Sequence, residues 1–263
     1  MILSKPYIIV ITIILIHIFS IPAHSYDREY EKKISNTLVQ KNEVTDLFWI
    51  NTRNSTFLSL LKVSPNDKNK GVAIILHSIG GHADWPDVIS PIRNRLPEHD
   101  LSTLSIQLPI ISPSKNIEEY GMVFQESNSR IKAAIKFLQT EGYNKIFLIG
   151  HGFGALSSLI YSERENAKYI NGMVFISLQN YNYIKPPINL LRLIKKIKIP
   201  ILDIYGSLDF KEAIDAAPDR RLASKKSGSG KYTQIEINNA DHYFQNMEDD
   251  LIKNIIHWVD NPL

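Results

Sequence analysis

The segment KIFLIGHGFGALSS, residues 145–158, decides how the rest of the chain is organised. It begins with a short apolar run, residues 146–149, of the kind that forms a buried strand. The glycine-rich turn GHGFG follows at residues 150–154, and small or apolar residues continue from Ala155. Glycine adopts backbone conformations that other residues reach only at a cost. This pattern therefore predicts a strand, a sharp turn and a helix.

The same kind of apolar run recurs along the chain, and residues with helical spacing separate the runs. Strands are predicted at residues 71–77, 101–108, 173–178, 200–205 and 233–237, and helices at residues 117–139, 188–198, 211–226 and 248–259. A further helix is expected to begin near Asp84, which suits an N-cap, with Pro86 in the first turn. Strands and helices that alternate in this way require a parallel sheet.

Two more strands precede this alternation. Residues 46–50 and 57–63 are predicted to pair as an antiparallel hairpin, because the turn at residues 51–55 is rich in Asn and Ser. The fold class is therefore α/β, with a mostly parallel central sheet of about eight strands and helices on both faces. The connection that follows the strand at residues 173–178 is too short for a large lid.

Glycines and polar residues gather just past the carboxyl ends of the predicted strands, where open α/β sheets place their binding sites. Asp209 and His242 follow the last two of these strands. A buried carboxylate that orients an imidazole forms an acid–base pair, so the two residues are predicted to meet beside the glycine-rich turn. A helix cap and an ordinary loop histidine are the simpler alternative. Six of the twelve glycines lie at the same edge: Gly80, Gly81, Gly150, Gly152, Gly154 and Gly206.

These features resemble the α/β-hydrolase fold over nearly all of the chain that follows the N-terminal segment. In that fold the turn G-x-S-x-G presents a serine nucleophile, and the acid and the base come later in the chain. Two segments, LHSIGGHADWPDVISPIRNRLP at residues 76–97 and LSTLSIQLP at residues 101–109, are similar to DUF3530, a family of exported bacterial proteins of unknown function. The resemblance implies the fold and no particular reaction.

The glycine-rich turn departs from the hydrolase pattern at its central position. Gly152 stands where the serine nucleophile belongs, so no covalent acyl-enzyme can form there. Loss of a triad nucleophile costs a factor of about a million in rate. Ordinary serine-esterase activity is therefore not expected. The backbone N–H groups of Gly80, Gly81 and Phe153 remain candidates for an oxyanion hole.

Two other routes to catalysis stay open. Ser78 replaces the glycine that usually follows the histidine after the first parallel strand, and it is the candidate for a displaced nucleophile. Alternatively, Asp209 and His242 are a remnant pair that activates water, which is weak catalysis without a metal or a strained substrate.

Histidines and aromatic residues are predicted to surround Gly152. His77, His82, Trp85 and His151 are the expected cleft-lining residues, with Tyr181 and Tyr183 at the mouth, either as packing or as a cradle for a ligand. The spacing of these histidines and His242 matches no short metal-ligand motif. No metal and no other cofactor is therefore predicted.

The N-terminus has the pattern of a secretory signal peptide. Residues 1–25 contain one cation, Lys5, then a long apolar run, and then small residues before an expected cleavage between Ser25 and Tyr26. An uncleaved membrane anchor is the alternative. The absence of Cys excludes a disulfide framework and a lipid-modified cysteine. Export to the periplasm or the extracellular space is expected, with no stable membrane insertion after cleavage.

The remaining residues are predicted to form a polar leader, residues 26–45, and a single α/β-hydrolase-like domain, residues 46–263. A formal net charge of +3 is too small and too dispersed to argue for nucleic-acid binding. The favoured function is a binding or accessory role in the cell envelope, with an unknown small molecule or envelope component as partner. An ester or acyl hydrolase that uses Ser78 or activated water is the alternative.

Overall fold

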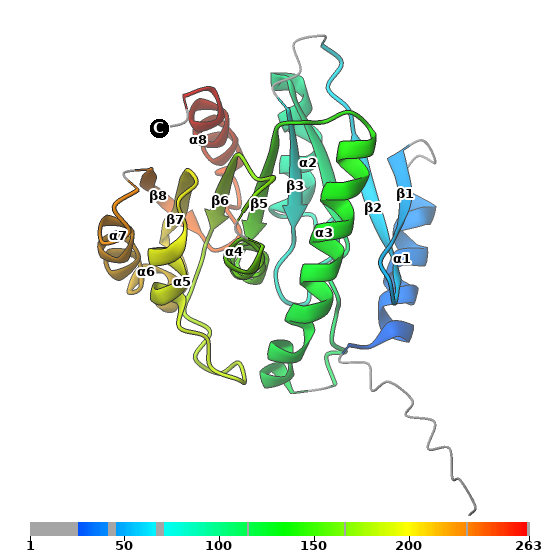
Figure 1. The fold of residues 1–263 in the computed structure, drawn as a ribbon, viewed down its shortest axis with the longest axis horizontal. Coiled ribbons are helices and arrows are strands. Elements are labelled where there is room, and N and C mark those ends of the chain that lie inside the picture. Colours follow the sequence, from blue (N-terminus) through cyan, green and yellow to red (C-terminus); the bar gives the residue numbers. More distant parts are fainter. Residues whose placement is uncertain are drawn as a thin grey trace, which may run out of the picture.

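The structure, a computed structural model, describes residues 26–41, 46–66, 71–114, 116–165, 167–229 and 231–261. The predicted signal peptide lies outside these residues. A central sheet is flanked by helices on both faces (Figure 1). Across the described ranges, no helix has both the length and the apolar character needed to cross a membrane.

Eight strands of the described chain form one sheet in the order β1-β2-β4-β3-β5-β6-β7-β8. β2 pairs antiparallel with β1 and with β4, and every other neighbouring pair is parallel. The mostly parallel α/β sheet predicted from the sequence is therefore confirmed. The strands are β1 (Leu47–Asn51), β2 (Thr56–Lys62), β3 (Gly71–Leu76), β4 (Leu101–Ile106), β5 (Ile146–His151), β6 (Gly172–Ile176), β7 (Ile201–Leu208) and β8 (Tyr232–Asp241).

Helices occupy most of the connections between the strands. One hydrophobic cluster joins α3, α4 and α5 to one face of the sheet, and a second joins α2 and α8 to the other face. The helices are α1 (Arg28–Lys41), α2 (Ile89–Arg95), η2 (Leu96–His99), η3 (Ile117–Val123), α3 (Phe124–Thr140), α4 (Phe153–Arg164), α5 (Leu190–Lys196), α6 (Lys211–Ile214), α7 (Ala217–Lys225) and α8 (Glu248–Asp260).

β3 shows why these strands are apolar throughout. Val72, Ile74 and Leu76 pack in the cluster with α3 and α4, whereas Ala73 and Ile75 pack in the cluster with α2 and α8. Successive side chains of a strand point to opposite faces, so a strand that is covered on both faces needs apolar residues at every position.

The helix expected near Asp84 begins instead at Ile89. Residues 83–88 form turns that side chains stabilise: the Trp85 indole donates a hydrogen bond to Asp87 (2.9 Å), and Asp84 accepts one from Arg93 Nε (3.1 Å). Local side-chain hydrogen bonds of this kind compete with helix formation, which explains the later start.

A buried arginine holds α1 against the sheet. Arg130 on α3 is fully buried, and its guanidinium donates to Glu31 of α1 (2.8 Å), to Glu126 (2.9 Å) and to the carbonyl of Gln107 (2.9 Å). The ring of Tyr26 lies 4.9 Å from the same guanidinium. The predicted polar leader thus contains a helix whose acidic residue neutralises a charge inside the core.

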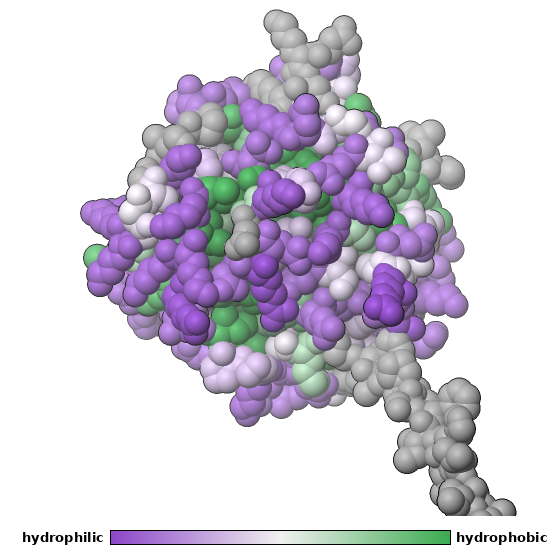
Figure 2. All heavy atoms as spheres, viewed as in Figure 1, coloured by the Kyte–Doolittle hydropathy of each residue, from purple (hydrophilic) through white to green (hydrophobic). Residues whose placement is uncertain are grey.

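Residues 177–189, between β6 and α5, form no helix or strand. The fold therefore has no large lid, as predicted. The face of the molecule shown in Figure 2 is mostly hydrophilic, with smaller hydrophobic areas among the hydrophilic residues.

Candidate active site

The turn after β5 has the strained geometry predicted for it. Gly152 has φ 51° and ψ −111°, a conformation that costs a residue with a side chain on the order of 1–3 kcal/mol. Gly154 brings α4 close to β3, because a Cβ at this position would lie only 2.1 Å from the carbonyl oxygen of Leu76. The turn is therefore shaped to present the side chain of residue 152, and Gly152 has none.

Ser78 fills the space beside Gly152. A Cβ added to Gly152 would lie 2.4 Å from Ser78 Oγ and 3.2 Å from Ser78 Cβ. The same hydroxyl oxygen accepts a hydrogen bond from the backbone N–H of Phe153 (3.3 Å). Ser78 thus occupies the place that a nucleophile side chain at position 152 would take.

Asp209 and His242 meet at the carboxyl ends of β7 and β8. His242 Nδ1 donates to Asp209 Oδ1 at 2.7 Å, and both side chains are buried. Because a carboxylate can only accept, the proton of the neutral imidazole lies on Nδ1, which leaves the lone pair on Nε2. This is the arrangement of an acid–base pair that is ready to take a proton at Nε2.

Two residues that sequence reasoning missed support this pair. Ser177, which follows β6, donates from Oγ to Asp209 Oδ2 at 2.5 Å, and the ring of Phe210 stacks on the imidazole with centroids 4.0 Å apart. Burial alone would raise the pKa of Asp209, but hydrogen bonds from His242 and Ser177 lower it below its ordinary value. Asp209 is therefore held as a carboxylate. No sequence motif marks Ser177 or Phe210 as part of a site.

His77 positions the loop that carries Ser78. Its Nδ1 donates to the Ser78 carbonyl (2.8 Å), and its Nε2 accepts from the N–H of Leu108 (3.0 Å) and from the Gln107 amide (2.8 Å). Burial lowers the pKa of His77 to about 3, so the ring is neutral. His77 does not line the cavity described below.

All three backbone N–H groups considered for an oxyanion hole have partners inside the protein. The N–H of Gly80 donates to the Tyr120 hydroxyl (3.3 Å), and the N–H of Gly81 donates to the Ser78 carbonyl (3.1 Å). The N–H of Phe153, the third, points to Ser78 Oγ. Of these three groups, Phe153 is the one next to the vacant nucleophile position.

The remaining predicted cleft residues divide into two groups. Trp85 and His151 line the cavity, whereas His82 packs edge-on against Trp85 with ring centroids 5.3 Å apart. His151 Nε2 donates to the His242 carbonyl (3.1 Å), and burial lowers the pKa of His151 to about 3. Among the described residues no group of His, Asp and Glu is placed to hold a metal ion.

A cavity of about 270 Å³ joins both parts of the site. Ser78 and His242 lie in its wall, together with the buried ring of Tyr181. Large apolar side chains form a partly exposed rim, which consists of Ile117, Tyr183, Phe210 and Tyr243.

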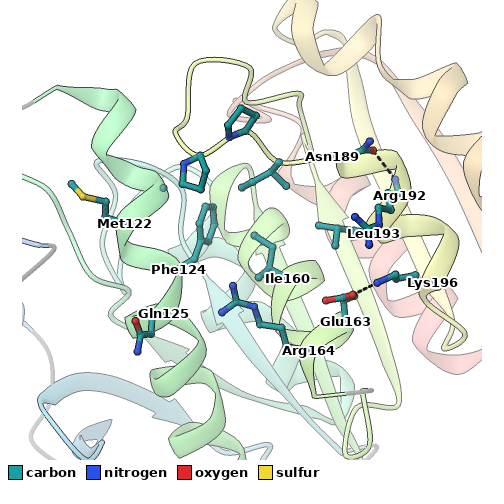
Figure 3. Close-up of a pocket in the computed structure, with 14 residues that line it drawn as sticks. Met122, Phe124, Gln125, Ile160, Glu163, Arg164, Asn189, Arg192, Leu193 and Lys196 are labelled. Atoms are coloured by element: carbon teal, nitrogen blue, oxygen red, sulfur yellow. Dashed lines mark hydrogen bonds and ion pairs between the residues drawn. The ribbon is translucent and has the colours of Figure 1, made fainter.

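A larger groove of about 480 Å³ lies between η3 and the start of α3 on one side and α4 and α5 on the other (Figure 3). Phe124 and Ile160 contribute apolar side chains to it, and an ion pair joins Glu163 to Lys196. None of the predicted site residues lines this groove. The smaller cavity is therefore the candidate active site, because of the two it is the one lined by Ser78 and by His242, the base of the acid–base pair.

The strand order, the strained turn after β5 and the acid–base pair after β7 and β8 define an α/β-hydrolase fold. The chain belongs to DUF3530, a protein family of unknown function, which it matches over residues 17–122 and 116–261. No curated protein matches it.

The solved structures that this chain resembles include esterases and other hydrolases. The esterase Pf2001 of Pyrococcus furiosus aligns with a TM-score of 0.68 at 15% identity, over 82% of this chain and 91% of that chain. Est1E of Butyrivibrio proteoclasticus, with ferulic acid bound, gives 0.67 at 14% identity, over 82% and 98%. XC6422 of Xanthomonas campestris, a serine hydrolase without a lid, gives 0.64 at 15% identity, over 81% and 93%. At these identities the likeness shows the fold alone.

Proposed function

We propose that this chain is a ligand-binding protein of the α/β-hydrolase fold that does not perform covalent serine catalysis at the glycine-rich turn. The observation that carries the proposal is the pair of Gly152 and Ser78. Gly152 supplies no nucleophile, and Ser78 fills the space where a serine at position 152 would stand. The Phe153 N–H, which would stabilise an oxyanion, is hydrogen-bonded to Ser78.

The cavity itself supports a binding role. It is about 270 Å³ in volume, its rim is apolar, and its base carries polar groups from Ser78, Tyr181 and His242. An apolar enclosure with a few directed polar groups is typical of small-molecule sites. The predicted signal peptide implies that the protein acts outside the cytoplasm, so the ligand would be a small molecule or a component of the cell envelope.

Labelling with a fluorophosphonate tests the absence of a serine nucleophile. Intact-mass spectrometry of the purified protein should show no adduct, with Ser78→Ala and His242→Ala as matched controls. A single adduct on the unmodified protein that disappears in both variants would overturn the proposal, because it would show that Ser78 is a nucleophile which His242 activates.

That outcome defines the second candidate function, an ester or acyl hydrolase with a displaced nucleophile. The position of Ser78 Oγ beside Gly152 and the Phe153 N–H favours it. In this reaction Ser78 Oγ attacks the acyl carbon, His242 Nε2 takes the hydroxyl proton and passes it to the leaving alcohol, and water then releases the acid. The described residues show no hydrogen bond between Ser78 and His242, which is why binding is the better-supported function.

A further inference from the structure

Tyr181 carries a buried hydroxyl group that has no partner. Its side chain is 6% exposed, and no described residue makes a hydrogen bond to its oxygen. The side chains of Gln179 and Ser78 approach this oxygen without meeting hydrogen-bond geometry. Buried polar groups are almost always satisfied, so an unpaired hydroxyl in the wall of a cavity indicates a missing partner.

The hydroxyl points at the centre of the site. It lies 3.0 Å from the position of a Cβ on Gly152. Edge-on ring contacts with Phe153 (6.1 Å) and Tyr183 (5.8 Å) hold the Tyr181 ring in this orientation. The group is therefore fixed before any ligand arrives, which lowers the entropic cost of binding.

The surroundings favour an oxygen acceptor as the missing partner. Burial raises the pKa of Tyr181, so its hydroxyl keeps its proton and can donate. Helix α4 begins at Phe153, beside Gly152, and the positive end of its dipole favours a negative or partly negative atom.

The rim of the cavity suggests the rest of the ligand. Ile117, Tyr183, Phe210 and Tyr243 present large, partly exposed apolar side chains around the opening. An apolar group that covers these side chains would remove them and itself from water, at roughly 25 cal/mol per Å².

We propose that the Tyr181 hydroxyl donates a hydrogen bond to the acyl oxygen of a carboxylic acid or ester whose apolar group packs against the rim. This inference rests on the proposed binding function and names its ligand class. Tyr181 takes over the recognition of the acyl oxygen, because the N–H groups of Gly80 and Gly81 are engaged within the protein. An acid and an ester share this oxygen, so the two sources are separated by experiment.

Calorimetric titration of the purified protein with three probes tests the proposal. Phenylacetate and methyl phenylacetate carry the acyl oxygen, and ethylbenzene is the apolar analogue that lacks it. Tyr181→Phe should weaken the binding of the acyl probes by about five- to tenfold and leave that of ethylbenzene unchanged, as expected for the loss of one hydrogen bond. If Tyr181→Phe binds only phenylacetate more weakly, the ligand is a carboxylic acid. If it binds only methyl phenylacetate more weakly, the ligand is an ester.

The matched control is Tyr161→Phe. Tyr161 is a buried tyrosine on α4 that does not line the cavity, so its variant should bind all three probes as the unmodified protein does. An equal loss for ethylbenzene would overturn the proposal, because it would show that Tyr181 acts through packing. Unchanged binding of the acyl probes by a folded Tyr181→Phe protein would also overturn it and leave the binding function intact. If the unmodified protein binds none of the probes, this inference fails, whereas the proposed binding function, which names no ligand class, is decided by the fluorophosphonate labelling.

Discussion

The two sides of the candidate active site differ in how completely they are built. On the side of β7 and β8, Asp209 and His242 lie 2.7 Å apart, and Ser177 and Phe210 fix their positions. On the side of β3 and β5, the turn is formed, but Gly152 has no side chain. An acid–base pair can therefore persist beside a vacant nucleophile position, because the side chains that hold it, Ser177 and Phe210, do not depend on residue 152.

The two sides are also anchored differently. A charged group holds the loops near Asp209: Arg220 is fully buried, pairs with Asp203 (2.8 Å), and donates to the carbonyls of Leu178 (2.6 Å) and Ala213 (3.0 Å). The loop of Ser78 is held by the neutral ring of His77. A buried charge must keep its partner, whereas a neutral group tolerates change at lower cost. The acid–base side should therefore be the more sensitive to substitution.

The largest effect is expected for Arg220→Ala. The substitution leaves the Asp203 carboxylate buried without its charge partner, which should lower the free energy of unfolding by about 3–5 kcal/mol. Urea denaturation measures the loss. Lys132→Ala is the control, because it removes the more exposed ion pair with Glu165 and should cost less than about 1 kcal/mol. Similar decreases in the free energy of unfolding of the two variants would contradict the view that the buried charge of Arg220 anchors the loops near Asp209.

The next prediction concerns the restoration of a serine nucleophile at position 152. The double variant Gly152→Ser with Ser78→Gly places a serine on the strained turn and clears the space around it, so hydrolysis of 4-nitrophenyl acetate should rise by about a hundredfold or more. In the single variant Gly152→Ser, the new Cβ would lie 2.4 Å from Ser78 Oγ, and a smaller gain is expected. Adding His242→Ala to the double variant should abolish the gain. A folded but inactive double variant would show that the acid–base side is not competent.

The smallest effect concerns the pH dependence of the acid–base side. The pKa of Asp209 is lowered in the folded protein, so this group stabilises the fold above the ordinary Asp pKa of about 4, and the contribution is lost as the pH falls through the lower folded value. Ser177→Ala removes one hydrogen bond that lowers this pKa. At pH 7 the variant should be less stable by about 1 kcal/mol, and the difference should shrink in acid.

Urea denaturation at several pH values measures this difference. Ser158→Ala is the control: Ser158 is buried and bonds to the backbone carbonyl of Ala155, so the cost of its loss should not change with pH. A difference for Ser177→Ala that stays constant down to pH 3 would show that its hydrogen bond does not influence the titration of Asp209.

Much of the architecture was predictable because it depends on residue order. The apolar runs that form β3 and β5 predict buried parallel strands, and the residues of the turn at 51–55 predict the hairpin before them. The helix near Asp84 was predicted too early, because the spacing of residues does not reveal that Trp85 and Arg93 hold a turn with their side chains. Ser177 and Phe210 were missed since nothing in their local sequence marks their contact with Asp209 and His242.

The sequence by itself determined the fold class, the glycine at the centre of the turn, and the order of Asp209 and His242 along the chain. These features depend on hydrophobic period and on which residues follow a strand, and both are local properties. Only the tertiary structure decided that Ser78 fills the space beside Gly152 and that the Tyr181 hydroxyl is left without a partner. Those contacts join loops that are distant in the chain, and they are fixed by how β3, β5 and β6 lie next to one another in the sheet.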